Sequence, residues 1–89
     1  MSGEHGNKKP IVLSPHAKDK LKRLITVEIT EDKAVKTIRN PESLTLGYFG
    51  RKIAQLPLTD EHLLRVIYEE NDNSILIITL YPAKRRRYE

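Results

Sequence analysis

Two apolar segments separated by a short polar turn constrain the fold more than any other feature of the chain. Residues 63–69 (LLRVIYE) and 75–81 (ILIITLY) are rich in β-branched, aromatic and leucine side chains, and ENDNS lies between them. β-Branched and aromatic residues favour strands, whereas Asn, Asp and Ser favour turns. The pattern therefore predicts a β-hairpin in the C-terminal half of the chain.

A second pair of apolar segments comes earlier. Residues 44–48 and 52–56 flank Phe49-Gly50-Arg51, which has the composition of a tight turn. The four segments follow one another with short connections, and this order predicts an antiparallel meander. Arg51 is exposed by its position in the turn, so it can either reach a ligand or simply face water.

Two helices are predicted before the meander. Ser14 is a favoured N-cap and the proline after it a favoured first helical residue, so the first helix starts there. Its apolar positions repeat with helical spacing and form one core-facing face: Ala17, Leu21, Leu24 and Ile25. Thr30 caps a second helix, which ends at Asn40 because the residue before a proline is pushed out of helical geometry. The link over 25–29 is compatible with an extended segment or with a continued helix.

These elements assign the chain to the α+β class. We expect two N-terminal helices packed on a four-stranded, mainly antiparallel twisted sheet, to which residues 11–13 can add a short extra N-terminal strand. The 89 residues suffice for one small domain. We place this domain at 10–83, after a disordered leader or cloning remnant over 1–9 and before a basic C-terminal arm over 84–89.

Several classes of function lack their signatures in this sequence. Without cysteine there is no disulfide framework and no thiolate metal site, which fits a reducing cytoplasm. The apolar run over 75–80 is too short to span a membrane, and residues 1–9 lack the apolar centre of a signal peptide. His16 and His62 show no metal-ligand spacing, and no nucleotide-binding glycine motif or nucleophile elbow is present. We therefore expect a cytoplasmic protein with no metal, no other cofactor and no membrane partner.

The formal net charge of +4 is concentrated at the C-terminus. Residues 84–89 (KRRRYE) carry four positive charges and one negative charge, which leaves the rest of the chain nearly neutral. Such a run suits phosphates or an acidic protein, and it is equally compatible with a solvated chain end. Tyr88 follows the run and is placed to stack on a base.

Another basic feature lies on the first predicted helix. His16, Lys20 and Arg23 follow one another at spacings of four and three residues, so they form one basic stripe beside the apolar face. Histidine suits general acid–base chemistry near neutral pH, and neighbouring cations suit a phosphate. The alternative is an ordinary surface histidine at a helix edge.

The C-terminal hairpin groups further polar side chains. If residues 70–74 form a five-residue loop, Arg65 lies opposite Thr79, and Arg65, Thr79 and Tyr81 project from the same face. A four-residue loop would place Leu64 opposite Thr79 and would remove Arg65 from that group.

The order of short motifs resembles a known toxin superfamily. SPHAKDKLKR, IRNPE, FGRKIA, LRVIYEE and IITLYPAKRRRY follow one another over residues 11–88, as in small uncharacterised domains related to RelE/ParE-type toxins, in the branch with an S-P-H-A helix and a T-x-Y-P strand. The resemblance implies two helices on a twisted antiparallel sheet and a metal-free ribonuclease that a small acidic antitoxin protein inhibits. The positions that match the pattern are His16, Arg23, Arg51, Arg65, Thr79 and Tyr81.

Metal-free RNA cleavage needs a base for the 2′-hydroxyl, positive charge at the phosphate and an acid for the leaving oxygen. His16 suits the base or the acid, and Tyr81 or Tyr88 is an alternative acid. The expected catalytic residues are His16, Arg51, Arg65, Thr79 and Tyr81. The expected nucleic-acid contacts are Lys20, Arg23, Lys84, Arg85, Arg86, Arg87 and Tyr88.

Three functions are compatible with these features. The first is a toxin-like ribonuclease that acts on messenger RNA, free or at the ribosome, and that has an antitoxin partner. The second is a non-catalytic module of the same fold that binds nucleic acid or protein. The third is a toxin that acts on a protein target, as the ParE side of the superfamily implies. The sequence favours the first function narrowly.

Overall fold

A computed structural model describes residues 9–24 and 29–88 of the chain, with the side chains of residues 87 and 88 outside that description. The elements are β1 (Ile11–Leu13), α1 (Pro15–Leu24), α2 (Glu31–Arg39), β2 (Ser43–Leu46), a 3-10 turn (Tyr48–Gly50), β3 (Lys52–Pro57), β4 (His62–Glu70), β5 (Ile75–Lys84) and the short helical turn α3 (Arg85–Tyr88). The α+β class is therefore confirmed. The ambiguous link over 25–28 lies outside the described residues.

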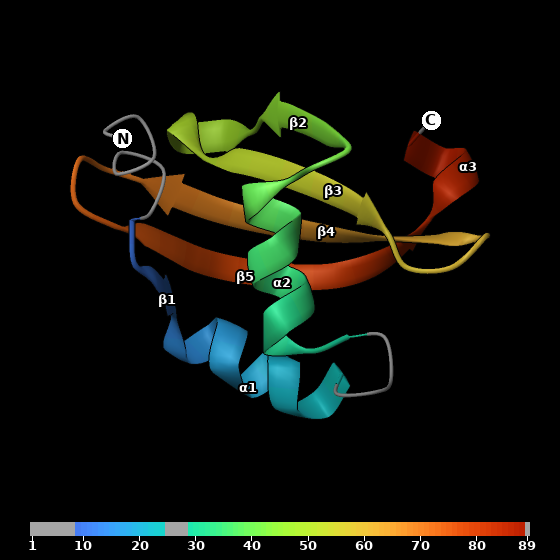
Figure 1. Cartoon of the computed structure of the whole chain (residues 1–89), viewed down its shortest axis with the longest axis horizontal. Coiled ribbons are helices and arrows are strands. Elements are labelled where there is room, and N and C mark those ends of the chain that lie inside the picture. Colours follow the sequence, from blue (N-terminus) through green and yellow to red (C-terminus); the bar gives the residue numbers. More distant parts are fainter. Residues whose placement is uncertain (1–8, 25–28, 89) are drawn as a thin grey trace, which may run out of the picture.

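The strands form one sheet in the order β1-β5-β4-β3-β2 (Figure 1). The predicted meander is present, because β2, β3, β4 and β5 pair with one another in antiparallel fashion. The expected four-stranded, mainly antiparallel sheet needs correction, since β1 joins β5 in parallel and makes the sheet five-stranded and mixed. A parallel neighbour is possible here because the intervening helices and strands carry the chain back across the sheet before β5 begins.

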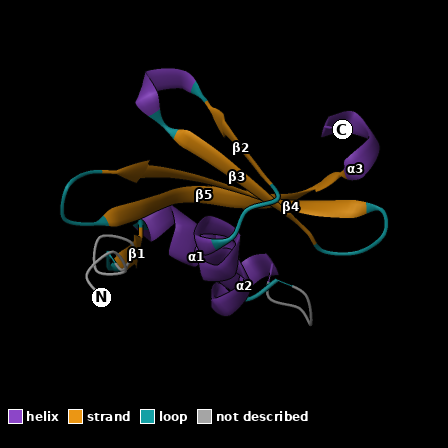
Figure 2. Cartoon of the chain, turned by 45° about the horizontal axis from the view of Figure 1, so that its top comes forward, coloured by secondary structure: helices purple, strands orange, loops and turns teal. Residues whose placement is uncertain are grey.

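Both main helices pack on the same face of the sheet (Figure 2). Their buried alanines, Ala17 and Ala34, are fully inaccessible and allow the helices to approach the strands closely. The strands contribute larger apolar residues to this core: Leu64, Val66, Tyr68, Ile77 and Leu80. Neither α1 nor α2 covers the opposite face, and we call it the open face (Figure 2).

The helix starts follow the predicted capping. The Ser14 hydroxyl accepts a hydrogen bond from the Ala17 amide at 3.0 Å, and the Thr30 hydroxyl accepts one from the Lys33 amide at 3.2 Å. These bonds satisfy amides that have no partner within the first helical turn. Ser14 also fastens the start of α1 to the sheet, because its amide donates to the Ile77 carbonyl and its hydroxyl to the Ile78 carbonyl.

The turn between β2 and β3 has an unusual backbone. Phe49 has φ 61° and Gly50 has φ 74°, both in the left-handed region. Glycine adopts this conformation without a Cβ penalty, whereas phenylalanine does so rarely. As a result the Phe49 side chain points away from the core and is 90% exposed.

The register of the C-terminal hairpin differs from both sequence-based alternatives. Glu70 pairs with Ile75, so the loop is 71–74, and the Asn71 carboxamide oxygen closes it by accepting hydrogen bonds from the Asn73 and Ser74 amides. A β-bulge then shifts the pairing between Ile67 and Tyr68. The bulge adds one residue to β5. With the shorter loop alone, Thr79 and Tyr81 would lie on the face opposite to Arg65, and the extra residue returns them to the face of Arg65.

Candidate nucleic-acid interface

The bulged register places Arg65 directly opposite Tyr81, instead of opposite Thr79 as predicted. The predicted shared face nevertheless holds, because Thr79 pairs with Ile67 two positions along β4. Arg65, Thr79 and Tyr81 therefore project from the open face. All three side chains are partly buried, and all three belong to strands β4 and β5, not to a loop.

Arg65 is held by side chains from both neighbouring strands. Its Nε donates a hydrogen bond to the Tyr81 hydroxyl at 2.9 Å, and its Nη1 donates to the Gln55 carboxamide oxygen. Gln55 is 7% exposed and lies opposite Arg65 in β3. The guanidinium is thus oriented by two neutral acceptors, so no carboxylate in these two contacts offsets its positive charge.

Tyr81 contacts two cations. The Lys20 Nζ is 5.5 Å from the centre of the Tyr81 ring, and the Arg65 Cζ is 5.8 Å from it. Both contacts are cation–π interactions, which place positive charge against the electron-rich ring. The phenolic oxygen accepts from Arg65, so the hydroxyl proton is free to be donated to a further acceptor. We call Lys20, Arg65 and Tyr81 the cationic cluster.

The basic stripe of α1 leads to this cluster. His16 is exposed and lies one helical turn before Lys20, so the two side chains are neighbours on the same side of α1. Arg23 continues the stripe but forms an ion pair with Asp19, one turn earlier. The structure therefore brings Lys20 to Tyr81, and His16 is the neighbour of Lys20 along the helix. Arg23 is instead paired with the Asp19 carboxylate.

Arg51 lies apart from the cationic cluster. Its Nε donates to the Glu69 carboxylate at 3.0 Å, and its guanidinium carbon lies 5.9 Å from the centre of the Phe49 ring. Glu69 is four residues from Arg65 along β4, which corresponds to roughly 13 Å of extended strand. The structure thus separates Arg51 from the other residues that the sequence grouped with it.

The C-terminal basic residues fold back against the domain. Lys84 is the last residue of β5, and the Arg85 amide donates to the Glu61 carbonyl at 2.9 Å. A hollow of about 210 Å³ is lined by residues of both charges: Asp60, Glu61, Lys84, Arg85 and Arg86. The two carboxylates reduce the positive potential of this segment. The side chains of Arg87 and Tyr88 lie outside the described residues.

Gln55 is the residue of this surface that the sequence did not reveal. Its position can be found only once β3 is paired with β4, because the partner of Arg65 depends on the register. Among the described residues, no group of three His, Cys, Asp or Glu side chains could hold a metal ion. Likewise, no helix within the described ranges is long and apolar enough to cross a membrane.

The chain was compared with protein-family models, with curated proteins and with solved structures. No family model, curated protein or solved structure matches it. The functional assignment therefore depends on the residues of the cationic cluster and on the helix edge beside it.

Proposed function

We propose that the chain binds single-stranded RNA along the edge formed by α1 and the open face of β5, and that it cleaves the bound RNA without a metal ion. The observation that carries the proposal is the contact of Tyr81 with both Arg65 and Lys20. It combines two positive charges with a phenol that has a proton to donate. Phosphate binding and proton donation are the two requirements that this geometry meets best.

The proposed chemistry uses the 2′-hydroxyl of the RNA as the nucleophile. The exposed imidazole of His16 accepts the proton of that hydroxyl, and the oxygen attacks the adjacent phosphorus. Lys20 and Arg65 stabilise the negative charge that develops on the phosphate oxygens. The bond from phosphorus to the 5′-oxygen breaks, and Tyr81 donates its proton to that leaving oxygen. The products are a 2′,3′-cyclic phosphate and a free 5′-hydroxyl.

A second candidate function is RNA binding without cleavage. His16 is exposed, and among the described residues no carboxylate contacts its imidazole to fix its orientation. General bases are commonly oriented by a second group, so this arrangement favours a surface that binds RNA without reacting with it. For the ribonuclease, the proposed partner is a small acidic inhibitory protein that covers the cationic cluster.

A cleavage assay in the presence of EDTA tests the proposal. Wild-type protein should cut a single-stranded RNA and should leave the same site intact when its 2′-hydroxyl is replaced by hydrogen. The variants His16→Ala and Tyr81→Phe should each lower the rate about 100-fold, the size typical of a lost acid or base. Lys36→Gln removes an exposed cation from α2 and serves as the matched control.

Binding to a 2′-O-methyl RNA, measured in parallel, separates the two functions. Tight binding without cleavage would support the binding module and exclude the ribonuclease. Absence of both binding and cleavage from folded protein would exclude both functions. Cleavage that persists in His16→Ala and Tyr81→Phe would locate the chemistry elsewhere in the chain.

A further inference from the structure

Strand β2 forms one border of the sheet (Figure 1). It also exposes apolar side chains. Its sequence is Ser43-Leu44-Thr45-Leu46, with no charged residue. Leu44 is 51% exposed and Leu46 is 78% exposed. Border strands of monomeric proteins usually carry charges, prolines or a cover that prevents pairing with another chain, and β2 has no charge or proline of its own.

The backbone of β2 presents hydrogen-bonding groups outward at alternate residues. The Gly47 amide donates to the Arg51 carbonyl at 2.7 Å, so Gly47 is bonded toward β3. In an antiparallel ladder the residues alternate between bonding inward and facing outward. The amide and carbonyl groups of Thr45 therefore face β3, whereas those of Leu44 and Leu46 face away from the sheet. Along the outer edge of β2, the backbone groups of Leu44 and Leu46 are therefore available for hydrogen bonds to another strand, with Thr45 between them.

Two cations close to β2 are already paired within the chain. Arg51 contacts Glu69 at 3.0 Å, and Lys52 contacts Glu70 at 2.8 Å. A strongly acidic partner would therefore find neither of these two cations unpaired. An uncharged, apolar strand is the better match, and β2 of a second copy of the chain is such a strand.

We propose that two copies of this chain associate through antiparallel pairing of their β2 strands, with Thr45 on the two-fold axis. In this register Leu44 lies opposite Leu46 of the second copy, and Leu46 lies opposite the second copy's Leu44. Each of these pairs exchanges two backbone hydrogen bonds, so the outward groups of both residues are satisfied in both copies. The leucine side chains of each pair share a face and cover one another.

The apolar surface beside β2 extends this interface. Tyr48 and Phe49 follow the strand and are 87% and 90% exposed. A hollow of about 610 Å³ next to them is lined mainly by apolar residues: Leu46, Tyr48, Phe49, Ile53 and Ile67. Pairing through β2 uses no residue of the cationic cluster, whose members lie on α1, β4 and β5. The proposal is therefore independent of the proposed RNA function.

Sedimentation velocity at increasing concentration of the full chain tests the pairing. We expect a reversible dimer with a dissociation constant on the order of 10–100 µM, because a four-residue strand is a small interface. Leu46→Lys places a charge in the interface, and Leu44→Pro removes an outward amide without removing a bond to β3. Each change occurs twice in a two-fold dimer, so each should raise the dissociation constant at least about tenfold.

Val12→Lys is the matched control, since Val12 is 49% exposed on β1 at the opposite border of the sheet. Circular dichroism and thermal unfolding test whether each variant is folded. If Leu44→Pro is unfolded, Leu46→Lys alone tests the pairing. Amide exchange adds a residue-level readout: Leu44 and Leu46 should gain protection as the concentration rises, and Thr45 should not. A wild-type chain that stays monomeric up to about 1 mM would overturn the proposal. So would a dimer that Val12→Lys weakens as much as Leu46→Lys does.

Discussion

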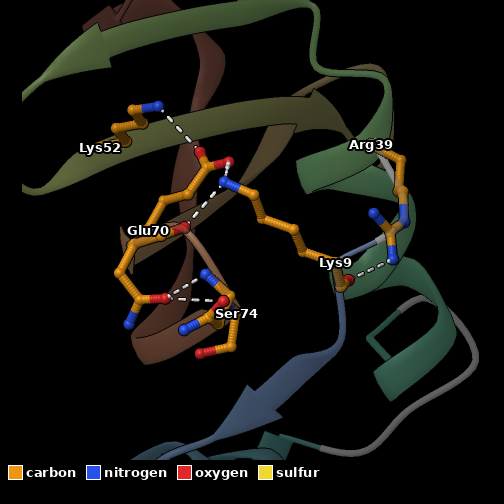
Figure 3. A network of polar contacts seen from close by, with 7 residues as sticks. Lys9, Arg39, Lys52, Glu70 and Ser74 are labelled. Carbon is orange, nitrogen blue, oxygen red and sulfur yellow. Dashed lines mark hydrogen bonds and ion pairs between the residues drawn. The ribbon is translucent and has the colours of Figure 1, made fainter. Parts of the chain in front are cut away.

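Glu70 links three segments of the chain through two lysines (Figure 3). Its carboxylate oxygens lie 2.8 Å from the Lys52 Nζ and 2.9 Å from the Lys9 Nζ. Lys9 also donates to the Asn71 carbonyl, while its own carbonyl accepts from Arg39. Lys9, two residues before β1, is therefore fixed both to the end of β4 and to the end of α2, which positions β1 beside β5.

This network makes stability depend on pH in a predictable direction. Hydrogen bonds from Lys52 and then Lys9 lower the pKa of Glu70 below its ordinary value of 4.5. A lowered carboxyl pKa contributes stability above its unfolded-state value, and this contribution is lost as the pH falls through the folded-state pKa. Glu70→Gln should therefore lower the free energy of unfolding by about 0.5–1 kcal/mol at pH 7. The difference from wild type should disappear once the pH is below the lowered pKa.

Urea unfolding of both proteins at several pH values checks this prediction. Glu42→Gln serves as the control, because Glu42 is exposed and forms none of these ion pairs. A stability difference that stays constant down to acidic pH would show that Glu70 acts through packing and not through its charge. The hydrogen bond to Glu70 raises the pKa of Lys52, so the same contact should weaken again at strongly alkaline pH.

At the scale of elements, Ser14 couples α1 to the sheet. Its hydroxyl accepts from the Ala17 amide at 3.0 Å and donates to the Ile78 carbonyl at 3.0 Å, beside the β-bulge. Thr30 makes the corresponding N-cap bond for α2. Because Ser14 serves both a helix and a strand, Ser14→Ala should cost about 1–2 kcal/mol, whereas Thr30→Ala should cost about 0.5–1 kcal/mol.

Denaturant unfolding of the two alanine variants measures the difference directly. Equal losses would mean that the bond to the Ile78 carbonyl contributes no stability. Because α1 carries Lys20 to the Tyr81 ring, a loosened start of α1 should also weaken RNA binding by the Ser14 variant. Thr30→Ala provides the comparison for that second measurement, since α2 contributes no residue to the cationic cluster.

The elements themselves could be predicted because their signals are local. Ser14 and Thr30 mark helix starts, and the four apolar segments with short connections mark the meander. The register of β4 and β5 could not be predicted, because it depends on the Asn71 turn and on a bulge within β5. The parallel pairing of β1 with β5 joins Ile11 to Ile75 and has no local signal.

The candidate site was predictable to the same extent. With a five-residue loop, the sequence placed Arg65, Thr79 and Tyr81 on one face; the loop is shorter, and the bulge in β5 restores that shared face. The sequence placed Lys20 on the basic stripe of the first helix, but it did not predict the contact of Lys20 with Tyr81. It also grouped Arg51 with them, although Arg51 is paired with Glu69 farther along the sheet. Such distances follow from the strand register, which the sequence did not specify.

At the scale of the whole molecule, two groups of cations differ in how far nearby carboxylates offset their charge. One is the cationic cluster, where neutral groups orient Arg65. The other is the C-terminal segment, where Asp60 and Glu61 share a hollow with Lys84 and Arg86. The formal net charge of +4 counts both places alike. A chain of phosphates distinguishes them, because a carboxylate next to a cation reduces the positive potential that attracts a phosphate.

The salt dependence of RNA binding should therefore reveal which cations contact the phosphates. For a single strand, each phosphate contact contributes about 0.7 to the slope of log K against log salt concentration. Lys20→Gln should lower that slope by about 0.7, whereas Arg86→Gln should lower it by less than half as much. Fluorescence anisotropy of a labelled 2′-O-methyl RNA, which the proposed chemistry cannot cleave, provides the measurement over roughly 50–200 mM KCl. Lys36→Gln should leave the slope unchanged. A larger effect of Arg86 than of Lys20 would place the main phosphate path along the C-terminal segment, and the carboxylates of Asp60 and Glu61 would then have to turn away from it when RNA binds.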